Sequence, residues 1–222
     1  MVAIDQYNIS PEIIKVSKHH IEVDQIDSDA RSIIQRLNRA GFKGYIVGGF
    51  VRDSILGLKP KDCDVVTDAT PEQVNSLLPR TRIIGRRFKI VHSRSGRKIT
   101  EISTFRSSSQ RNTQKSNKGL VLRDNNYGNI EDDAFRRDFT INSLYLDIEK
   151  MEIIDFVGGF KDLQNKKLKS IGDSFERFKE DPVRILRAIR FKAKLSLDLD
   201  KKLEADMKKL SYLLSSQLFL FF

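Results

Sequence analysis

The apolar residues of this chain form short runs that are separated by glycine, proline and polar residues. Residues 28–40 carry one apolar stripe at helical spacing, which predicts a helix. A β-prone run follows at residues 45–47 and is interrupted by Gly48-Gly49. Residues 51–56 can then form one or two helical turns, which Gly57 ends. The pattern predicts helix, strand, glycine turn and short helix in succession.

The middle of the chain alternates between helix and strand signals. Thr70, Pro71 and Gln73 have the spacing of an N-cap, a first-turn proline and a capping box, which predicts a helix that reaches about residue 78. Strands are predicted within residues 82–91, with a turn at Gly85, and again over residues 98–105.

The strand predicted over residues 98–105 places its one acid on a defined face. Because side chains alternate along a strand, Glu101 shares a face with Ile99 and Ser103. Residues 107–119 follow and are polar and basic without apolar periodicity. They are predicted to form a flexible loop, either a solvated linker or a segment that lies on RNA phosphates.

The remaining elements are weaker predictions. A hairpin around Glu149-Lys150 joins two apolar runs within residues 144–156. Asp181 and Pro182 can begin a helix, in which three residues are expected to pack inward: Ile185, Leu186 and Ile189. A lysine-rich helix is predicted over residues 200–214, and a short helix start at residues 10–12. His19-His20 are expected to be surface residues.

Charge and cysteine content narrow the class of protein. The net charge is +10. Residues 79–123 contain thirteen Lys and Arg residues but only one acidic residue, Glu101. This local excess favours a polyanionic partner such as RNA over a merely lysine-rich surface. Cys63 is the only cysteine, so no internal disulfide is expected and a reducing compartment fits. Neither a signal peptide nor an apolar run of membrane-spanning length is recognisable.

Asp62 and Asp64 are the first candidate catalytic residues. Two residues apart on a strand, they would point to one face, with Cys63 directed the other way into packing. Paired carboxylates repel each other unless a cation lies between them, and oxygen ligands suit Mg²⁺. The preceding glycine turn could offer backbone N–H groups to a triphosphate. Together these features suggest nucleotidyl transfer by a two-metal mechanism, whereas either feature alone is more often a solvated strand edge or a turn.

Four segments in order resemble one family. GGFVRDSILG and KDCDVVTDATPEQ, at residues 48–57 and 61–73, resemble the class II tRNA nucleotidyltransferase and bacterial poly(A) polymerase family of the polymerase β nucleotidyltransferase superfamily. RRDFTINSL, at residues 136–144, resembles the motif that contacts sugar and triphosphate. EDPVR, at residues 180–184, resembles the motif that reads the incoming base.

The resemblance implies a role for each candidate residue. Asp62 and Asp64 would hold Mg²⁺, and either Glu101 or Asp138 would complete the catalytic acids, one of which helps to activate the 3′-hydroxyl. The residues that would bind the triphosphate, sugar and base of ATP are Gly48, Gly49, Arg52, Asp53, Arg137, Asp138, Asp181, Arg184 and Arg187. Simpler interpretations stay open: Glu101 pairs with an arginine, Arg137 and Asp138 form a surface pair, and Asp181 only caps its helix.

The implied fold is α/β (α+β), with a small mixed sheet flanked by helices and followed by the start of an all-helical neck. The expected division is an N-terminal extension at residues 1–27, a catalytic head at 28–157 and a neck at 158–222, joined by a flexible Gly158-Gly159 link. The apolar end SSQLFLFF suggests a truncated chain.

The expected activity is transfer of AMP from ATP to an RNA 3′ end. DATPEQ, IIGRRFKIVH, LRDNNYG and FKEDPVRILRAIRF resemble the poly(A) polymerase branch more than the CCA-adding branch. Phe50 departs from the family, where a third glycine is common, so a less flexible backbone is expected there. The alternatives are a CCA-adding enzyme and a non-catalytic RNA-binding remnant. A cytoplasmic monomer is expected.

Overall fold

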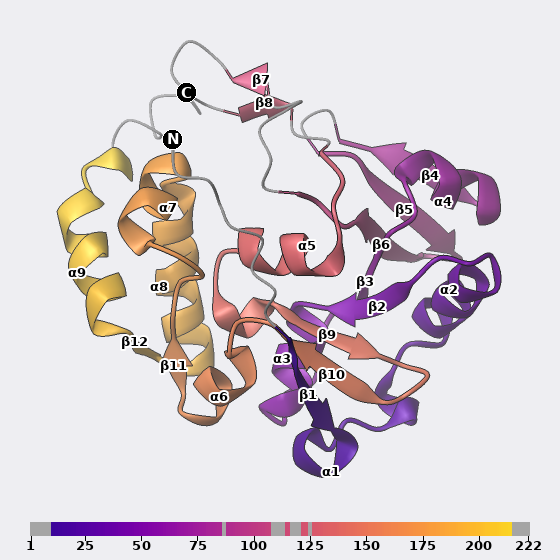
Figure 1. Cartoon of the computed structure of the whole chain (residues 1–222), viewed down its shortest axis with the longest axis horizontal. Helices are drawn as coiled ribbons and strands as arrows, with labels where there is room; N and C mark the ends of the chain where they lie inside the picture. The colour runs from indigo at the N-terminus through magenta and orange to yellow at the C-terminus, as the bar shows by residue number, and fades with distance from the viewer. Residues whose placement is uncertain (1–9, 86–87, 108–113, 116–120, 124–125, 215–222) are drawn as a thin grey trace.

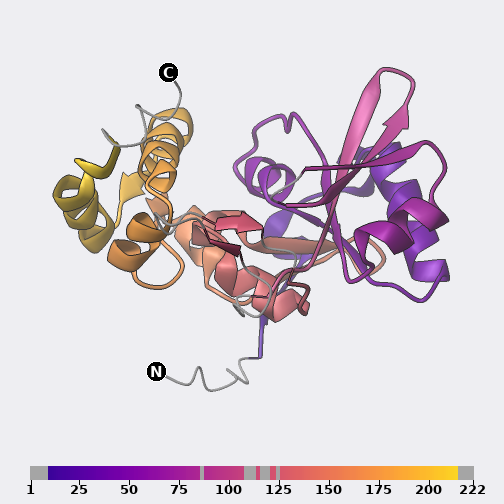
Figure 2. The ribbon, with the colours of Figure 1, turned by 90° about the horizontal axis from the view of Figure 1, so that it is seen from above.

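The computed structural model describes residues 10–85, 88–107, 114–115, 121–123 and 126–214. One large sheet with its helices, here called the head, occupies one side of the molecule, and a group of helices from residue 159 onward, here called the neck, lies on the other (Figures 1 and 2). Within the described residues, no helix has the length and apolar character that a membrane crossing requires.

The head sheet contains eight strands. They are β1 Glu12–Lys15, β2 Gly44–Val47, β3 Asp64–Thr67, β4 Thr81–Ile84, β5 Ile90–Ser95, β6 Lys98–Thr104, β9 Leu144–Asp147 and β10 Glu152–Asp155. Their spatial order is β1-β10-β9-β2-β3-β6-β5-β4. All neighbours are antiparallel except β3 and β6, which are parallel. The predicted mixed sheet is confirmed.

Helices cover both faces of the sheet. On one face, α2 Ser28–Arg39, α3 Gly49–Ile55 and α4 Pro71–Leu77 pack into the larger core. On the other, α5 Ile130–Arg136 covers a smaller cluster that includes Val47, Val66 and Tyr145. The capping box at Thr70 is confirmed, because its hydroxyl accepts from the Gln73 N–H and the Gln73 side chain accepts from the Thr70 N–H.

The neck consists of short elements that pack on one another. These are α6 Gly159–Gln164, β11 Lys167–Leu168, α7 Ser174–Glu180, α8 Val183–Leu195, β12 Asp198–Leu199 and α9 Lys201–Leu210. β11 and β12 pair in parallel, and α7 lies against α9. Buried Phe178, Ile185 and Leu203 supply the apolar contact between these helices. The predicted helix over residues 200–214 is present but ends at Leu210.

The N-terminal prediction is wrong. Instead of a helix start at residues 10–12, Glu12–Lys15 forms the edge strand β1, which pairs with β10. A short helix α1, Val16–His19, and a 3₁₀ turn η1, Val23–Gln25, follow. His19 is buried rather than exposed. Its Nδ1 accepts from the Ile21 N–H at 3.0 Å, and its Nε2 lies 3.1 Å from the Met151 carbonyl oxygen. These residues close the sheet edge opposite to β4.

The inward packing of Leu186 and Ile189 is also wrong. Ile185 is buried, but Leu186 and Ile189 are 52% and 50% exposed. Successive residues turn by about 100° around a helix, so the face that buries Ile185, Ala188 and Phe191 directs the other two to solvent.

The Gly158-Gly159 link is a hydrogen-bonded turn rather than a free joint. The buried Asp155 carboxylate accepts from four consecutive backbone N–H groups, those of residues 157–160, at 2.9–3.1 Å. A Cβ on Gly159 would lie 2.2 Å from the Thr140 carbonyl oxygen, so only glycine permits this close contact. The glycine pair therefore fixes α6 against the 3₁₀ turn η2, Thr140–Asn142.

Two further predictions meet the limits of the described residues. Part of the predicted loop at 107–119 is strand, because β7 Gln114–Lys115 pairs with β8 Val121–Arg123. Residues 108–113 and 116–120 of that loop lie outside the described residues, and so does the apolar end at 215–222.

Candidate active site

A row of side chains crosses the sheet on the face covered by α5. Val47 on β2 pairs with Asp64 on one side and with Tyr145 on the other. The register of β3 with β6 places Asp64 beside Glu101, because the next residues along, Val65 and Ile102, are partners. Paired positions direct their side chains to the same face. The expected meeting of Asp64 and Glu101 is therefore present.

The row continues to the far edge of the sheet. His92 on β5 pairs with Glu101, and Arg82 on β4 pairs with His92. His92 Nε2 lies 3.4 Å from a Glu101 carboxylate oxygen. Glu101 is thus held between an acid on one side and an imidazole on the other.

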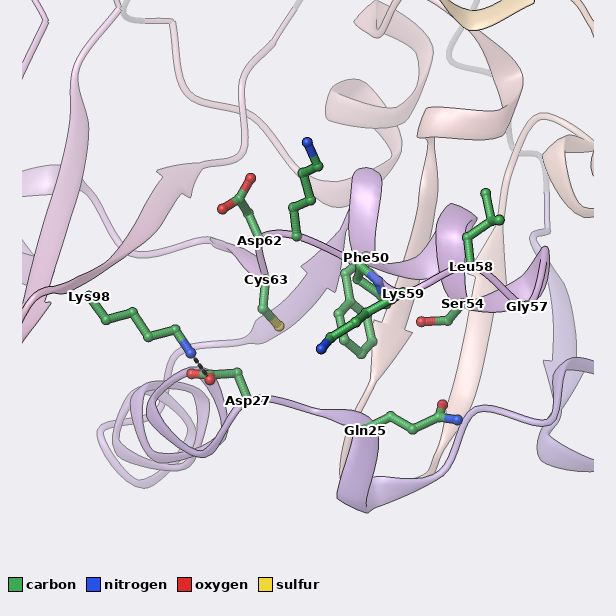
Figure 3. Close-up of a pocket in the computed structure, with 12 residues that line it drawn as sticks. Gln25, Asp27, Phe50, Ser54, Gly57, Leu58, Lys59, Asp62, Cys63 and Lys98 are labelled. Carbon is green, nitrogen blue, oxygen red and sulfur yellow. Dashed lines mark hydrogen bonds and ion pairs between the residues drawn. The ribbon is translucent and has the colours of Figure 1, made fainter. Parts of the chain in front are cut away.

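Asp62 does not share the strand with Asp64. β3 begins at Asp64, and Asp62 lies in the exposed loop before it, so the expected placement of both aspartates on one strand is wrong. Figure 3 shows the Asp62 carboxylate and the Cys63 thiol pointing apart, with the thiol directed toward Phe50. Burial raises the pKa of this thiol to about 12, which keeps it protonated at neutral pH. Cys63 packs against the core, as predicted.

A cavity of about 520 Å³ lies on the Cys63 side of this loop (Figure 3). Phe50, Ser54 and Lys59 line it, and an ion pair between Lys98 and Asp27 borders it. Asp62 contributes to the lining but Asp64 and Glu101 do not, so the cavity adjoins the acidic group only at Asp62.

Asp64 is electrostatically unsatisfied. Burial raises the pKa of its carboxyl to about 6, with Glu101 and Asp62 adding to the shift and Arg137 opposing it. Two acids whose fields add at a third carboxylate form a donor set that a hard divalent cation compensates. Within the described residues, no three acidic, histidine or cysteine side chains already converge as a metal cage. This set suits Mg²⁺, which takes one or two carboxylates and completes its shell with water and substrate oxygens.

Arg137 is fixed by two residues that the sequence did not reveal. Its Nε donates to the Asp133 carboxylate at 3.0 Å and to the Tyr145 hydroxyl oxygen at 2.9 Å, while its Nη2 donates to Asp133 at 2.7 Å. Burial acts to raise the pKa of Asp133, but Arg137 and Arg136 outweigh it and hold that pKa below its ordinary value. The guanidinium is therefore oriented before any ligand binds.

Asp138 lies at the joint between head and neck. Arg187 of α8 donates to it through Nε at 2.7 Å, with Nη2 at 2.6 Å. Asn142 also donates to Asp138, at 3.1 Å. The structure thus brings Glu101 rather than Asp138 beside Asp64, and gives Asp138 a cationic partner from the neck.

Arg52 and Asp53 lie beneath the glycine turn and are both 5% exposed. Arg52 donates to Asp53 and to the Asn142 side chain, each at 2.7 Å, and its guanidinium lies 5.0 Å from the Phe191 ring centre. They brace α3 against η2 and α8, so any effect on a bound triphosphate is indirect. Gly48 has φ +73° and starts α3, as the predicted glycine turn requires.

The predicted base-reading residues make contacts within the neck. The Asp181 carboxylate accepts from the Val183 N–H at 3.2 Å, but α8 has Pro182 as its N-cap residue and Asp181 ends α7, so the predicted N-cap at Asp181 is wrong. Arg184 donates to the Arg177 carbonyl at 2.9 Å and to Glu180 at 3.2 Å. Arg184 and Arg187 are three residues apart, yet they contact different partners, one in the neck and one in the head.

Arg177 is a further residue that sequence analysis missed. Its Nη2 donates to the carbonyl oxygens of Arg136 and Arg137, at 2.5 and 2.6 Å, and its Nη1 pairs with Glu180 at 3.2 Å. Burial, followed by the neighbouring Arg184, lowers the pKa of this guanidinium. The only local signal was Glu180 three residues later on α7, because the other partners are forty residues away in the chain.

Comparisons with known proteins agree with this geometry. A family model described as the poly A polymerase head domain matches residues 44–169. Poly(A) polymerase I of Salmonella typhimurium is 46% identical over 209 residues, which is 91% of this chain. The chain spans 45% of that relative's length.

Two solved structures share the fold. The Bacillus stearothermophilus CCA-adding enzyme in complex with CTP is 32% identical, with a TM-score of 0.69 over 82% of this chain and 43% of its own. The Thermotoga maritima CCA-adding enzyme complexed with tRNA is 27% identical, with a TM-score of 0.67 over 89% of this chain and 45% of its own. Nucleotide and RNA are therefore bound by proteins of this fold.

Proposed function

The chain belongs to the poly(A) polymerase head-domain family, and on this premise we propose that it transfers AMP from ATP to the 3′-hydroxyl of an RNA, as a cytoplasmic monomer. The placement of Asp64 beside Glu101 on one sheet face carries the proposal. Identity to a poly(A) polymerase I is 46%, against 32% and 27% to the two CCA-adding enzymes, which favours ATP as the substrate.

Asp64, together with Asp62, would hold Mg²⁺, which would supply the positive charge that a triphosphate and a reacting oxygen need. Glu101 would accept the proton of the 3′-hydroxyl on a carboxylate oxygen, because it is the acid that lies beside Asp64 and still has open space in front of it.

Arg137 would bind phosphate through Nη1, which Asp133 and Tyr145 leave free and which donates to the Asn142 carbonyl oxygen at 3.4 Å. Arg184 and Asp181 would hydrogen bond to the edge of the adenine. Arg184 now contacts Glu180, and Arg187 contacts Asp138, so nucleotide binding would exchange these internal contacts for contacts with the ligand.

CCA addition to tRNA is the second candidate. The specific observation in its favour is that the solved structures with this fold are CCA-adding enzymes, one with CTP and one with tRNA.

Primer extension distinguishes the candidates. The purified chain is incubated with Mg²⁺ and either a general labelled RNA or a tRNA that lacks CCA, with ATP alone or CTP alone. A ladder on the general RNA with ATP is the expected result. CTP addition confined to the tRNA would establish the second candidate instead, and RNA binding with no extension would establish a non-catalytic remnant.

A further inference from the structure

Three exposed arginines lie along the free edge of the head sheet. They are here called the arginine edge. Arg80 directly precedes β4, Arg82 lies on β4, and Arg94 lies on β5. In the part of the chain that the structure describes, none of them forms an ion pair with a carboxylate. Arg94 has a neutral partner, since its Nε donates to the Gly96 carbonyl at 3.1 Å. These are cations whose charge the described head does not neutralise.

Two members of the arginine edge, Arg82 and Arg94, lie on the catalytic face. Arg82 pairs with His92, and His92 pairs with Glu101, so Arg82 ends the row that contains Asp64. Three strand-to-strand steps separate Arg82 from Asp64, about 14 Å in all. Arg94 follows His92 by two residues and, by alternation, faces the same side. A strand of RNA whose 3′ end lies at the acids can reach these arginines within a few nucleotides.

The neck does not lie over β4 and β5, so it does not obstruct an approach to the acids from that side. On the other side of the acids, Arg187 of α8 is bound to Asp138, and Arg177 of α7 is bound to the Arg136 and Arg137 carbonyls. Figures 1 and 2 show the neck on one side of the head and β4, β5 and β6 on the opposite side. An RNA that approaches from the neck side would meet these contacts, whereas one that approaches over β5 and β4 would not.

A groove of about 350 Å³ continues beyond the edge, between α2 and the ends of β4 and β5. Its lining includes three arginines, three serines and one carboxylate: Arg36, Arg80, Arg94, Ser32, Ser93, Ser95 and Asp29. Guanidinium groups suit phosphate because they donate in a planar fork, and hydroxyls can add neutral hydrogen bonds. Positive charge therefore follows a continuous route from the catalytic face around the edge of the sheet.

We propose that the arginine edge binds the phosphodiester backbone of single-stranded RNA upstream of the 3′ end that enters the active site. The inference rests on the proposed function, because it assigns the RNA path of that same site. Phosphates carry no base identity, so this surface holds RNA without regard to sequence. The neighbouring groove extends the contact to longer RNA.

The test compares two double variants with the same loss of charge. Arg82→Gln with Arg94→Gln removes two cations from the arginine edge. Lys15→Gln with Lys18→Gln removes two exposed cations from β1 and α1, at the opposite edge of the sheet. Binding of a labelled single-stranded RNA of about 20 nucleotides is followed by fluorescence anisotropy at several salt concentrations.

The slope of log affinity against log salt should become shallower by about 1.4 in the arginine variant, since each lost phosphate contact contributes about 0.7. Affinity at low salt should fall about tenfold, and the lysine variant should match the wild type. Equal losses in both variants would overturn the proposal, because net charge alone would then attract RNA. Competition by polyglutamate as strong as that by unlabelled RNA would also overturn it, and would point to an acidic protein partner.

Extension assays separate this proposal from the proposed function. For the arginine variant, the KM for the long primer should rise about tenfold, while the KM values for ATP and for a dinucleotide primer stay unchanged. A wild type that binds RNA through these arginines without extending it would refute catalysis and retain the binding surface. A wild type that extends RNA with no dependence on these arginines would refute the surface and retain catalysis.

Discussion

Asp64 and Asp133 are two largely buried carboxylates that belong to the same side of the head sheet, yet their surroundings differ in sign. Asp64 has two acids as neighbours, and its pKa is raised to about 6. Asp133 receives hydrogen bonds from Arg136, Arg137 and Tyr145, and its pKa is lowered. A buried charge without a cation costs stability, whereas pairing and hydrogen bonding offset that cost.

The difference in surroundings distinguishes a carboxylate of the candidate active site, Asp64, from one that supports the structure, Asp133. Asp133 is satisfied within the chain and holds Arg137 in position. Asp64 is left for a ligand to satisfy, which is how perturbed groups mark functional sites. The joint between head and neck follows the scaffold pattern, since Asp138, Arg187 and Arg177 all have partners.

The largest expected effect concerns which acid works with Asp64. Glu101→Gln should lower kcat by about 10²- to 10³-fold with little change in the KM for ATP, because it removes the group placed to accept the proton. Asp138→Asn should instead raise that KM, about tenfold, because it removes a carboxylate that is proposed to contact the sugar of ATP. Steady-state kinetics of both variants decide between them. A fall in kcat for Asp138→Asn, with only a KM effect for Glu101→Gln, would assign the role of third catalytic acid to Asp138.

The second prediction tests the scaffold half of the comparison. Asp133→Asn should lower the free energy of unfolding by about 3 kcal/mol at pH 7, because the charge of Arg137 would remain buried without its partner. The pKa of Asp133 is depressed in the folded state, so its contribution is present above the unfolded pKa and is lost as the pH falls below about 4. Urea denaturation at pH 7 and pH 3 measures both effects. An unchanged stability at pH 7 would show that Asp133 is not what anchors Arg137.

The third prediction is that the pH dependence of stability that arises from Asp64 is opposite in sign to that from Asp133. Its folded pKa is raised from 3.8 to about 6, so the folded state binds more protons between these values and the metal-free protein loses stability as the pH rises through them. Asp64→Asn removes this loss and should be more stable than the wild type by about 2–3 kcal/mol at pH 8, but not at pH 4. Urea denaturation in EDTA makes the measurement. A variant that is less stable than the wild type at pH 8 would mean that Asp64 is compensated within the chain.

The smallest effect concerns Arg177, a positioning residue. Arg177→Gln should raise the KM for ATP about tenfold without changing the KM for RNA, because the segment that carries Arg137 would lose two hydrogen bonds to its carbonyls. Arg177→Lys should restore part of the loss, since an ammonium can still donate to one carbonyl. Arg190→Gln, an exposed site on α8, is the matched control. Equal changes in Arg177→Gln and Arg190→Gln would leave Arg177 with no role beyond its charge.

Local patterns predicted what depends on neighbours in the chain. Alternation grouped Glu101 with Ile99 and Ser103 on one strand face, the family resemblance suggested that it joins the aspartates, and the capping box at Thr70 was identified from three residues. Asp62 shows the limit of such patterns, because alternation holds only where the strand exists and β3 starts at Asp64. The family resemblance identified the acids and the RRD segment from motifs alone.

Contacts between residues that are far apart in the chain could not be predicted from the sequence. Asp133, Tyr145 and Arg177 act on Arg137 from three different elements, and no short-range spacing marks that convergence. The apolar positions Leu186 and Ile189 looked like core residues because periodicity does not say which face of a helix is covered.

The most direct test of the account is AMP transfer by Asp64→Asn, measured beside its folded fraction. Wild type and variant are incubated with Mg²⁺, ATP and a labelled RNA, and the rate of primer extension is divided by the amount of folded protein from circular dichroism. The account predicts a folded variant that extends RNA at least about 10²-fold more slowly than the wild type. A folded variant that extends RNA at the wild-type rate would contradict it, because the unsatisfied carboxylate would then have no part in the reaction.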